Sequence, residues 1–204
     1  MSFAKAKRRL QLIINRKDLT DALAAEFIND SMADLERNLR LGGMEVVLTQ
    51  QDWDGVKNEV IVPPGYLETL NFFTDTKELT MCDLSVFLAL EDQGGEPTHY
   101  VKIADRWLLR PTPAAGTKVH LHCYSQSPAL IADTDENLWT RAALGALTYQ
   151  AASLAADIFQ MEDQHVARFQ GRADRYAAEM AAQDLNENWS GRISIPLPSN
   201  SGSY

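Results

Sequence analysis

Residues 134–188 decide the fold, and they read TDENLWTRAALGALTYQAASLAADIFQMEDQHVARFQGRADRYAAEMAAQDLNEN. Side chains that are mostly apolar or small recur every three or four residues, the spacing of one helical face. They form two series, Trp139, Ala143, Ala146, Gln150, Leu154 and Ile158, then His165, Phe169, Ala173, Tyr176 and Met180. Residues 129–195 contain no proline, so long helices are permitted. The pattern predicts two long amphipathic helices with a turn near Gln160, the first of them capped by Asp133 or Thr134.

The N-terminal end has helical patterns of its own. Residues 19–41 place apolar side chains at helical spacing, with Thr20 as the candidate cap and Gly42–Gly43 as the stop. Before this helix, Leu10, Ile13 and Ile14 form a short apolar face. Both ends of the chain are therefore expected to be helical.

Between the helical ends the pattern becomes that of strands. Residues 44–49 and 58–62 are rich in β-branched side chains, and the turn-forming residues 52–55 between them predict a hairpin with a long tip. Further strand-like runs are residues 66–73, 99–103, 107–110 and 118–124, and residues 83–90 read as a short helix. Closely spaced hairpins of this type favour an antiparallel meander.

The expected fold class is α+β. A helical bundle domain from both chain ends, residues 1–43 and 128–189, would carry an inserted antiparallel β domain, residues 44–127. Residues 190–204 are rich in Ser, Gly, Pro and Asn and read as an extended C-terminal arm. Its apolar residues alternate, which suits strand addition or groove binding on another subunit, although a simple disordered end is the other interpretation. The candidate partner-binding residues of the arm are Ile193, Ile195, Pro196, Leu197 and Pro198.

Charge is distributed unevenly along the chain. The net charge is −9, but six cations precede the first acid, Asp18, which leaves 13 cations against 28 acids and a net of −15 in the remainder. A protein that gains affinity by neutralising phosphates does not have such an acidic body. The basic start suits either nucleic acid or the acidic surface of a neighbouring copy, and charge complementarity favours the second. Its candidate contact residues are Lys5, Lys7, Arg8 and Arg9.

Motifs for catalysis, cofactor binding or metal binding are missing from the sequence. His120 and His122 share one face of a strand but lack a third ligand, and turn chemistry explains Asp52 and Asp54. No phosphate-binding glycine loop with lysine and no nucleophile elbow occurs. We therefore expect no enzyme, no cofactor and no metal.

Three further expectations follow from single residues and from hydropathy. Trp53 lies at the tip of the expected hairpin, where a large aromatic side chain either contacts a partner or packs back onto the sheet. Cys82 and Cys123 lack metal-ligand spacing and read as reduced packing thiols of a chain made in a cytoplasm. No apolar run approaches the roughly 18 residues of a membrane span.

A series of segments then carries a resemblance. In order they are VPPGYLE (62–68), LSVF (84–87), GGEPTHY (94–100), WLLRPTPAAG (107–116), HLHCY (120–124) and SPAL (127–130). They follow the N-terminal helices and lead into the Ala-rich helix and a second helix with Phe169 and Tyr176. Over residues 22–188 the chain resembles the head-to-tail adaptor proteins of tailed bacteriophages, the connector or head-completion class that includes the tail tubular protein A of short-tailed phages.

The resemblance implies a structural role in the virion neck for a protein made in the bacterial host cytoplasm. Such adaptors form a ring, typically of twelve copies, between the portal protein and the tail or nozzle. Genomic DNA passes through the ring channel without specific binding. The alternative from a different class is a nucleic-acid-binding accessory protein that uses residues 1–17 as a basic arm.

Overall fold

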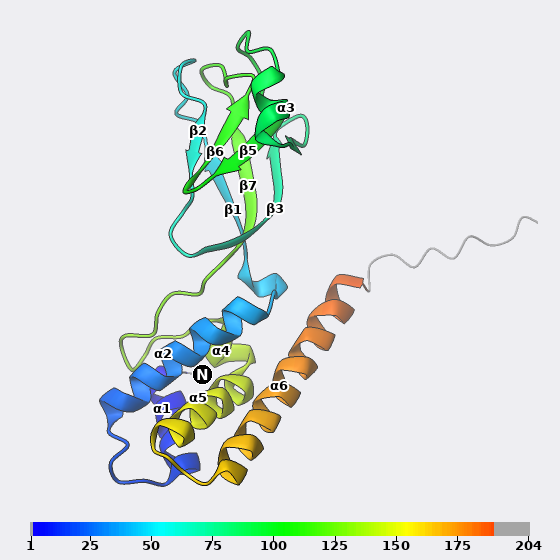
Figure 1. Cartoon of the computed structure of the whole chain (residues 1–204). Helices are drawn as coiled ribbons and strands as arrows, with labels where there is room; N and C mark the ends of the chain where they lie inside the picture. Colours follow the sequence, from blue (N-terminus) through cyan, green and yellow to red (C-terminus); the bar gives the residue numbers. More distant parts are fainter. Residues whose placement is uncertain (1, 190–204) are drawn as a thin grey trace, which may run out of the picture. The chain divides into compact units, whose positions relative to one another are not determined.

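The computed structural model describes residues 2–189 and confirms the α+β class (Figure 1). The chain divides into two compact units. One comprises Met1–Gly42 and the chain from Leu130 onward, and the other comprises Gly43–Ala129.

The first unit is helical. Its helices are α1 (Phe3–Ile14), α2 (Asp21–Asn38), α4 (Leu138–Ala142), α5 (Leu144–Ile158) and α6 (Asp163–Trp189). Helix α5 packs against α1, α2 and α6 and forms the centre of the unit. Its small side chains are fully buried, which lets the surrounding helices approach closely. They are Ala146, Ala151, Ala152, Ala155 and Ala156.

The helical hairpin begins later than the sequence predicts. Asn137, and neither Asp133 nor Thr134, caps α4, because its side chain accepts from the Thr140 backbone N–H while the Thr140 hydroxyl accepts from the Asn137 N–H. The helix then breaks at Ala143 before α5 begins. The turn near Gln160 is confirmed, since Gln160 has a φ of 51° between α5 and α6.

The two predicted apolar faces have different outcomes. Phe169 and Ala173 of α6 are buried, so that face is confirmed at its centre. Ile158, at the end of the first series, is 55 % exposed, so that face does not extend to the end of α5.

The N-terminal helices also correct the prediction in part. The cap at Thr20 is confirmed, because its hydroxyl accepts from the Leu23 N–H at 3.2 Å. The stop at Gly42–Gly43 is wrong, since α2 ends at Asn38 where Leu39 becomes extended. Gly42 instead begins a short 3₁₀ helix, and its N–H donates to the Asp184 carboxylate of α6 at 2.8 Å.

The second unit contains two sheets and the short helix α3 (Leu84–Ala89). The first sheet has the order β1-β7-β3, with antiparallel strands β1 (Glu45–Gln50), β7 (Val119–Ser125) and β3 (Tyr66–Thr74). The second has the order β2-β6-β5-β4, with β2 (Glu59–Ile61), β6 (Arg106–Arg110), β5 (His99–Ile103) and β4 (Thr80–Met81). Only the β4–β5 pair of this sheet is parallel over the described residues.

Strand pairing differs from the predicted meander. Strands β1 and β2 do not form a hairpin, because each pairs with a later strand, β7 and β6 respectively. The two sheets meet at the β3–β4 turn, where the Leu79 N–H donates to the Phe72 carbonyl at 2.7 Å. Strands β1 and β2 are therefore the outer strands of one curled arrangement, and over residues 2–189 neither pairs with a further strand.

Candidate functional site

Helix α1 presents a basic face to solvent. Lys5, Arg8 and Leu12 are exposed at helical spacing, and Leu12 is 72 % exposed. Together with Ala4 and Arg9 they line a surface hollow of about 640 Å³. The Arg9 guanidinium lies 5.9 Å from the centre of the Tyr149 ring of α5. An anionic surface with an apolar contact point complements this face.

Lys7 does not belong to the basic face. Its side chain is buried, and its Nζ pairs with the carboxylates of Asp133, at 2.7 Å, and Asp21. Hydrogen bonds to Asp133 and then Asp21 raise the pKa of Lys7. The prediction that Lys7 contacts a partner is therefore wrong, because this cation is used to join α1 to α2 and to the loop before α4.

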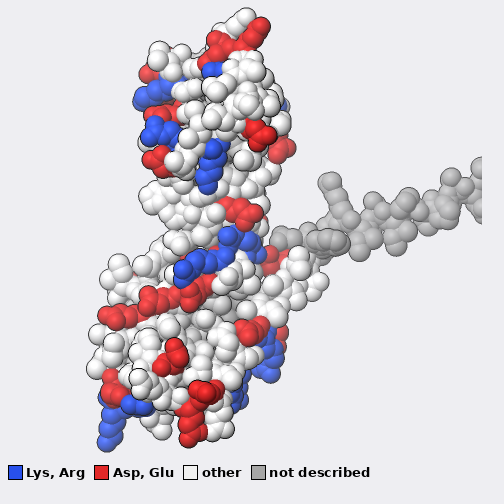
Figure 2. All heavy atoms as spheres, viewed as in Figure 1, with Lys and Arg blue, Asp and Glu red and all other residues white. Residues whose placement is uncertain are grey.

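A row of acids lies on the solvent side of α2. Glu26, Asp30 and Asp34 follow one another at four-residue spacing, and Glu26 and Asp30 are exposed. Figure 2 shows acidic side chains gathered over this helix. The helical unit thus carries a basic surface on α1 and an acidic surface on α2.

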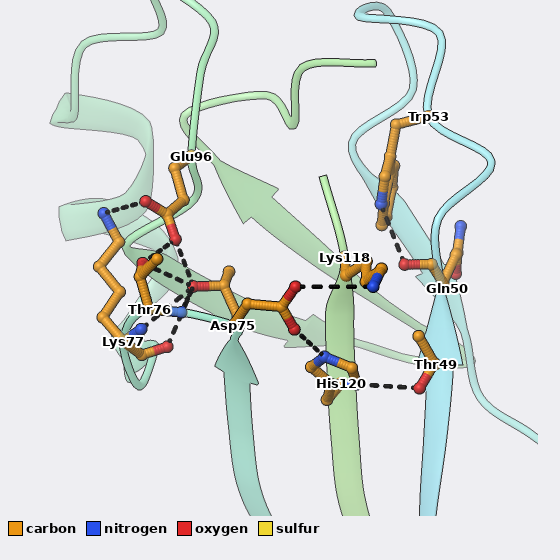
Figure 3. A network of polar contacts seen from close by, with 10 residues as sticks. Thr49, Gln50, Trp53, Asp75, Thr76, Lys77, Glu96, Lys118 and His120 are labelled. Atoms are coloured by element: carbon orange, nitrogen blue, oxygen red, sulfur yellow. Dashed lines mark hydrogen bonds and ion pairs between the residues drawn. The ribbon is translucent and has the colours of Figure 1, made fainter. Parts of the chain in front are cut away.

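Trp53 is buried in the β unit. It is 4 % exposed and belongs to the same core as Phe72, Trp107 and Leu121. Its indole N–H donates to the Gln50 carbonyl at 3.3 Å (Figure 3). The expectation of an exposed aromatic contact is wrong, and the alternative that the ring packs onto the sheet is what the structure shows.

The acids beside Trp53 belong to a turn. The Asp54 carboxylate accepts from the backbone N–H groups of Lys57, at 2.7 Å, and Val56, at 2.9 Å. These two hydrogen bonds, that from Lys57 first, lower the pKa of Asp54. Turn chemistry therefore accounts for this carboxylate.

Histidines of β7 connect neighbouring strands. The His120 ring lies between the Thr49 hydroxyl of β1 and the Asp75 carboxylate of the β3–β4 turn, each at 2.9 Å (Figure 3). The hydrogen bond to His120 lowers the pKa of Asp75. His122 contacts Glu45 of β1 in the same way, at 2.9 Å. Within the described chain, no three His, Cys, Asp or Glu side chains form a metal site.

The opening between β1 and β2 is a feature that the sequence prediction missed. A hollow of about 140 Å³ lies there, and its apolar lining comes from the two edges and from strands β3 and β7: Leu48, Ile61, Pro63, Phe72, Val119 and Leu121. Leu48 is 42 % exposed and Ile61 is 71 % exposed. The signal in the sequence is the apolar run Val46–Val47–Leu48, which places aliphatic side chains on both faces of one strand.

Two other expectations concern segments rather than side-chain clusters. The candidate arm residues Ile193, Ile195, Pro196, Leu197 and Pro198 lie outside the described residues. Within the described part of the chain, no helix has the length and the apolar character that a bilayer span requires.

The geometry therefore offers a basic face, an acidic row and an apolar edge groove, all of them suited to protein partners. Comparison with known proteins supports the resemblance to head-to-tail adaptor proteins. Residues 1–196 match the family model of the SU10 adaptor protein. A search of the curated proteins found no match. The narrower likeness to tail tubular protein A stays a prediction. The match covers nearly the whole chain, and the protein therefore belongs to the SU10 adaptor protein family, a family of structural head-to-tail adaptors of phages.

Proposed function

We propose that this protein forms a ring in the phage neck, between the portal protein and the tail or nozzle. Membership of the adaptor family supports the location. The observation that supports a ring is the presence of two oppositely charged surfaces on the helical unit. A ring needs head-to-tail contacts between two different patches of each copy, and a single self-complementary patch would give a closed dimer.

The basic face of α1, formed by Lys5, Arg8 and Arg9, would contact the acidic row of α2 on the next copy. Electrostatic complementarity of this kind guides association and selects the register. The apolar Leu12 beside the basic side chains adds area that association removes from water. A ring of twelve copies follows the family expectation.

Genomic DNA would pass through the ring without specific binding. The net charge of −15 beyond the first six cations favours a channel wall that repels phosphate. A repulsive wall lets DNA slide because it has no sites that hold the backbone.

The alternative, a nucleic-acid-binding basic arm, would have to use a folded helix and only part of the six cations. Residues 3–14 form a helix whose Phe3, Ala6 and Leu10 are buried. Lys7 is paired, and Arg16 forms an ion pair with Asp18 at 2.6 Å. Two of the six cations are therefore held in ion pairs, and Lys5, Arg8, Arg9 and Lys17 are the four left to neutralise phosphates.

Mass photometry of the purified full chain, alone and mixed with portal rings of the same phage, tests the proposal. We expect a stoichiometric adaptor–portal complex. A chain that ignores portal rings, but binds duplex DNA at moderate salt, would contradict the adaptor proposal and restore the nucleic-acid alternative.

A further inference from the structure

The curled sheets of the β unit leave one side open between two unpaired edges. Strand β1 pairs with β7 and strand β2 pairs with β6, so over the described residues the outward backbone groups of both edges have no strand partner. At one end the gap is spanned by a side chain, since the Gln50 amide lies 3.5 Å from the Glu59 carbonyl oxygen. Exposed edges of this kind are templates for strand addition.

The floor of the opening is apolar. Leu48 lies opposite Leu121 in the β1–β7 register, so its side chain is on the inner face of the sheet with that buried residue. Phe72 and Val119 complete the floor, and Ile61 and Pro63 line the β2 side. The hollow of about 140 Å³ is comparable to the roughly 150 Å³ cavity that accepts a benzene-sized apolar group. It therefore has room for one branched aliphatic side chain.

The sequence of residues 193–198, Ile-Ser-Ile-Pro-Leu-Pro, has the pattern that such an edge requires. Side chains alternate between the two faces of a strand, so Ile193, Ile195 and Leu197 would share one face. Backbone N–H groups also alternate in direction along a strand. Both prolines, at 196 and 198, therefore occupy positions whose N–H would point away from the strand that residues 193, 195 and 197 pair with. A proline is tolerated in an edge strand when its missing N–H points to solvent.

We infer that residues 193–198 of one copy add to strand β1 of a neighbouring copy and place an aliphatic side chain in the β1–β2 opening. The segment matches β1 in length, since Glu45–Gln50 has 6 residues. Ile193, Ile195 and Leu197 would then contribute both the backbone N–H groups that pair with β1 and the apolar side chains that become buried. This inference rests on the proposed ring, because the strand comes from another copy.

Disulfide trapping between full-length chains tests the inference. One chain carries Leu48→Cys, and a second, size-tagged chain carries Ile195→Cys. Both carry Cys82→Ser, because Cys82 is half-buried, whereas Cys123 is 0 % exposed and stays native. Each chain has a single accessible thiol, so a mixed disulfide between the differently sized chains reports only contact between an arm and another copy.

The matched control replaces Leu48→Cys with Val47→Cys. Val47 is also exposed, at 56 %, but it lies opposite His122 on the other face of β1. We expect the mixed disulfide to form about tenfold more with Leu48→Cys than with Val47→Cys, because the arm side chains enter only the inner face. Equal yields at the two positions would overturn the inference.

A peptide competition checks the alternation. A synthetic peptide of residues 190–204 should suppress the Leu48→Cys disulfide, whereas a peptide with residues 195 and 196 exchanged should not, because a proline N–H is then missing on the pairing side. Equal suppression by the two peptides would also overturn the inference. Portal is absent from these mixtures, so their failure is separate from failure of the neck adaptor proposal, which the portal titration decides.

Discussion

A buried polar side chain of α2 fixes the position of α4 in the helical unit. Glu36 of α2 is 1 % exposed, and its carboxylate accepts from the indole N–H of Trp139 in α4 at 2.7 Å. Trp139 is itself fully buried. This hydrogen bond joins the N-terminal helices to the C-terminal ones within the core, where water cannot replace a lost donor.

Replacing Trp139→Phe should lower the free energy of unfolding by about 1–3 kcal/mol, because the substitution removes one donor from a buried carboxylate. Urea unfolding followed by circular dichroism measures the change. In a Glu36→Gln background the same substitution should cost less, since a neutral acceptor is less expensive to leave without this donor. An equal cost in both backgrounds would show that the cost comes from packing alone.

Asp135 controls the loop that precedes α4. Its carboxylate accepts from the backbone N–H groups of Ile131, at 2.8 Å, and Ala132, at 2.7 Å, and these bonds lower the pKa of Asp135. A lowered pKa in the folded state adds stability above pH 3.8, the unperturbed value, and that stability is lost as the pH falls through the folded-state pKa.

The Asp135→Asn variant should therefore show a smaller fall in Tm than the native protein between pH 5 and about pH 2.5. Scanning calorimetry over this range makes the comparison. Asp105→Asn is the control, because Asp105 is an exposed aspartate whose carboxylate contacts the Arg106 guanidinium, at 3.3 Å, and not the backbone N–H groups of a loop. Parallel Tm profiles for native protein and Asp135→Asn would contradict the assigned role.

At the scale of elements, α5 and α6 approach closely because small residues separate them. A Cβ atom added to Gly145 would lie 3.0 Å from the Tyr176 ring, whereas one added to Gly171 of α6 would meet nothing within 4 Å. The Tyr176 ring in turn stacks on Tyr149 at 5.8 Å between ring centres. Gly145 is thus the point where α5 gives room to an aromatic side chain of α6.

The two glycines should respond differently to alanine. Gly171→Ala should stabilise the protein by about 0.5–1 kcal/mol, because alanine has the higher helix propensity and the site is open. Gly145→Ala should destabilise it, since the ring must move and Gly145 lies near the helix start, where propensity counts for less. Chemical denaturation of both variants decides, and equal gains would contradict the close-approach argument.

At the scale of the whole molecule, assembly should depend on charge. Reversing the basic face with Lys5→Glu and Arg8→Glu should weaken adaptor–portal ring assembly, and more so at low salt, because exposed charges are screened by ions. Adding Glu26→Lys and Asp30→Lys to the same chain should recover part of the assembly, because the two surfaces exchange sign. Mass photometry across a salt series gives the readout.

The control for this charge reversal is Lys17→Glu, which alters an exposed cation beyond the end of α1. Lys17→Glu reverses one charge and the basic-face variant reverses two. We expect Lys17→Glu to cause less than half of the loss of assembly that the basic-face variant causes. Equal loss in the two cases, or no recovery by the reversed acids, would mean that net charge rather than the α1–α2 contact governs assembly.

Local pattern determined much of this protein from sequence alone. The α+β class, the Thr20 cap, the turn at Gln160 and the strands at 99–103 and 107–110 follow from periodicity, capping and turn chemistry, which act within a few residues. The ordered segments also pointed to the adaptor family, which the match over residues 1–196 confirms.

Only the tertiary structure decided the contacts between distant residues. Strands β1 and β2 are neighbours in the chain, yet each pairs with a strand more than 40 residues away. Lys7 is buried because Asp21 and Asp133 neutralise it, and Trp53 is buried because the curled sheets enclose its ring. Local sequence cannot specify such outcomes, since pairing and burial depend on which distant surfaces remove a side chain from water.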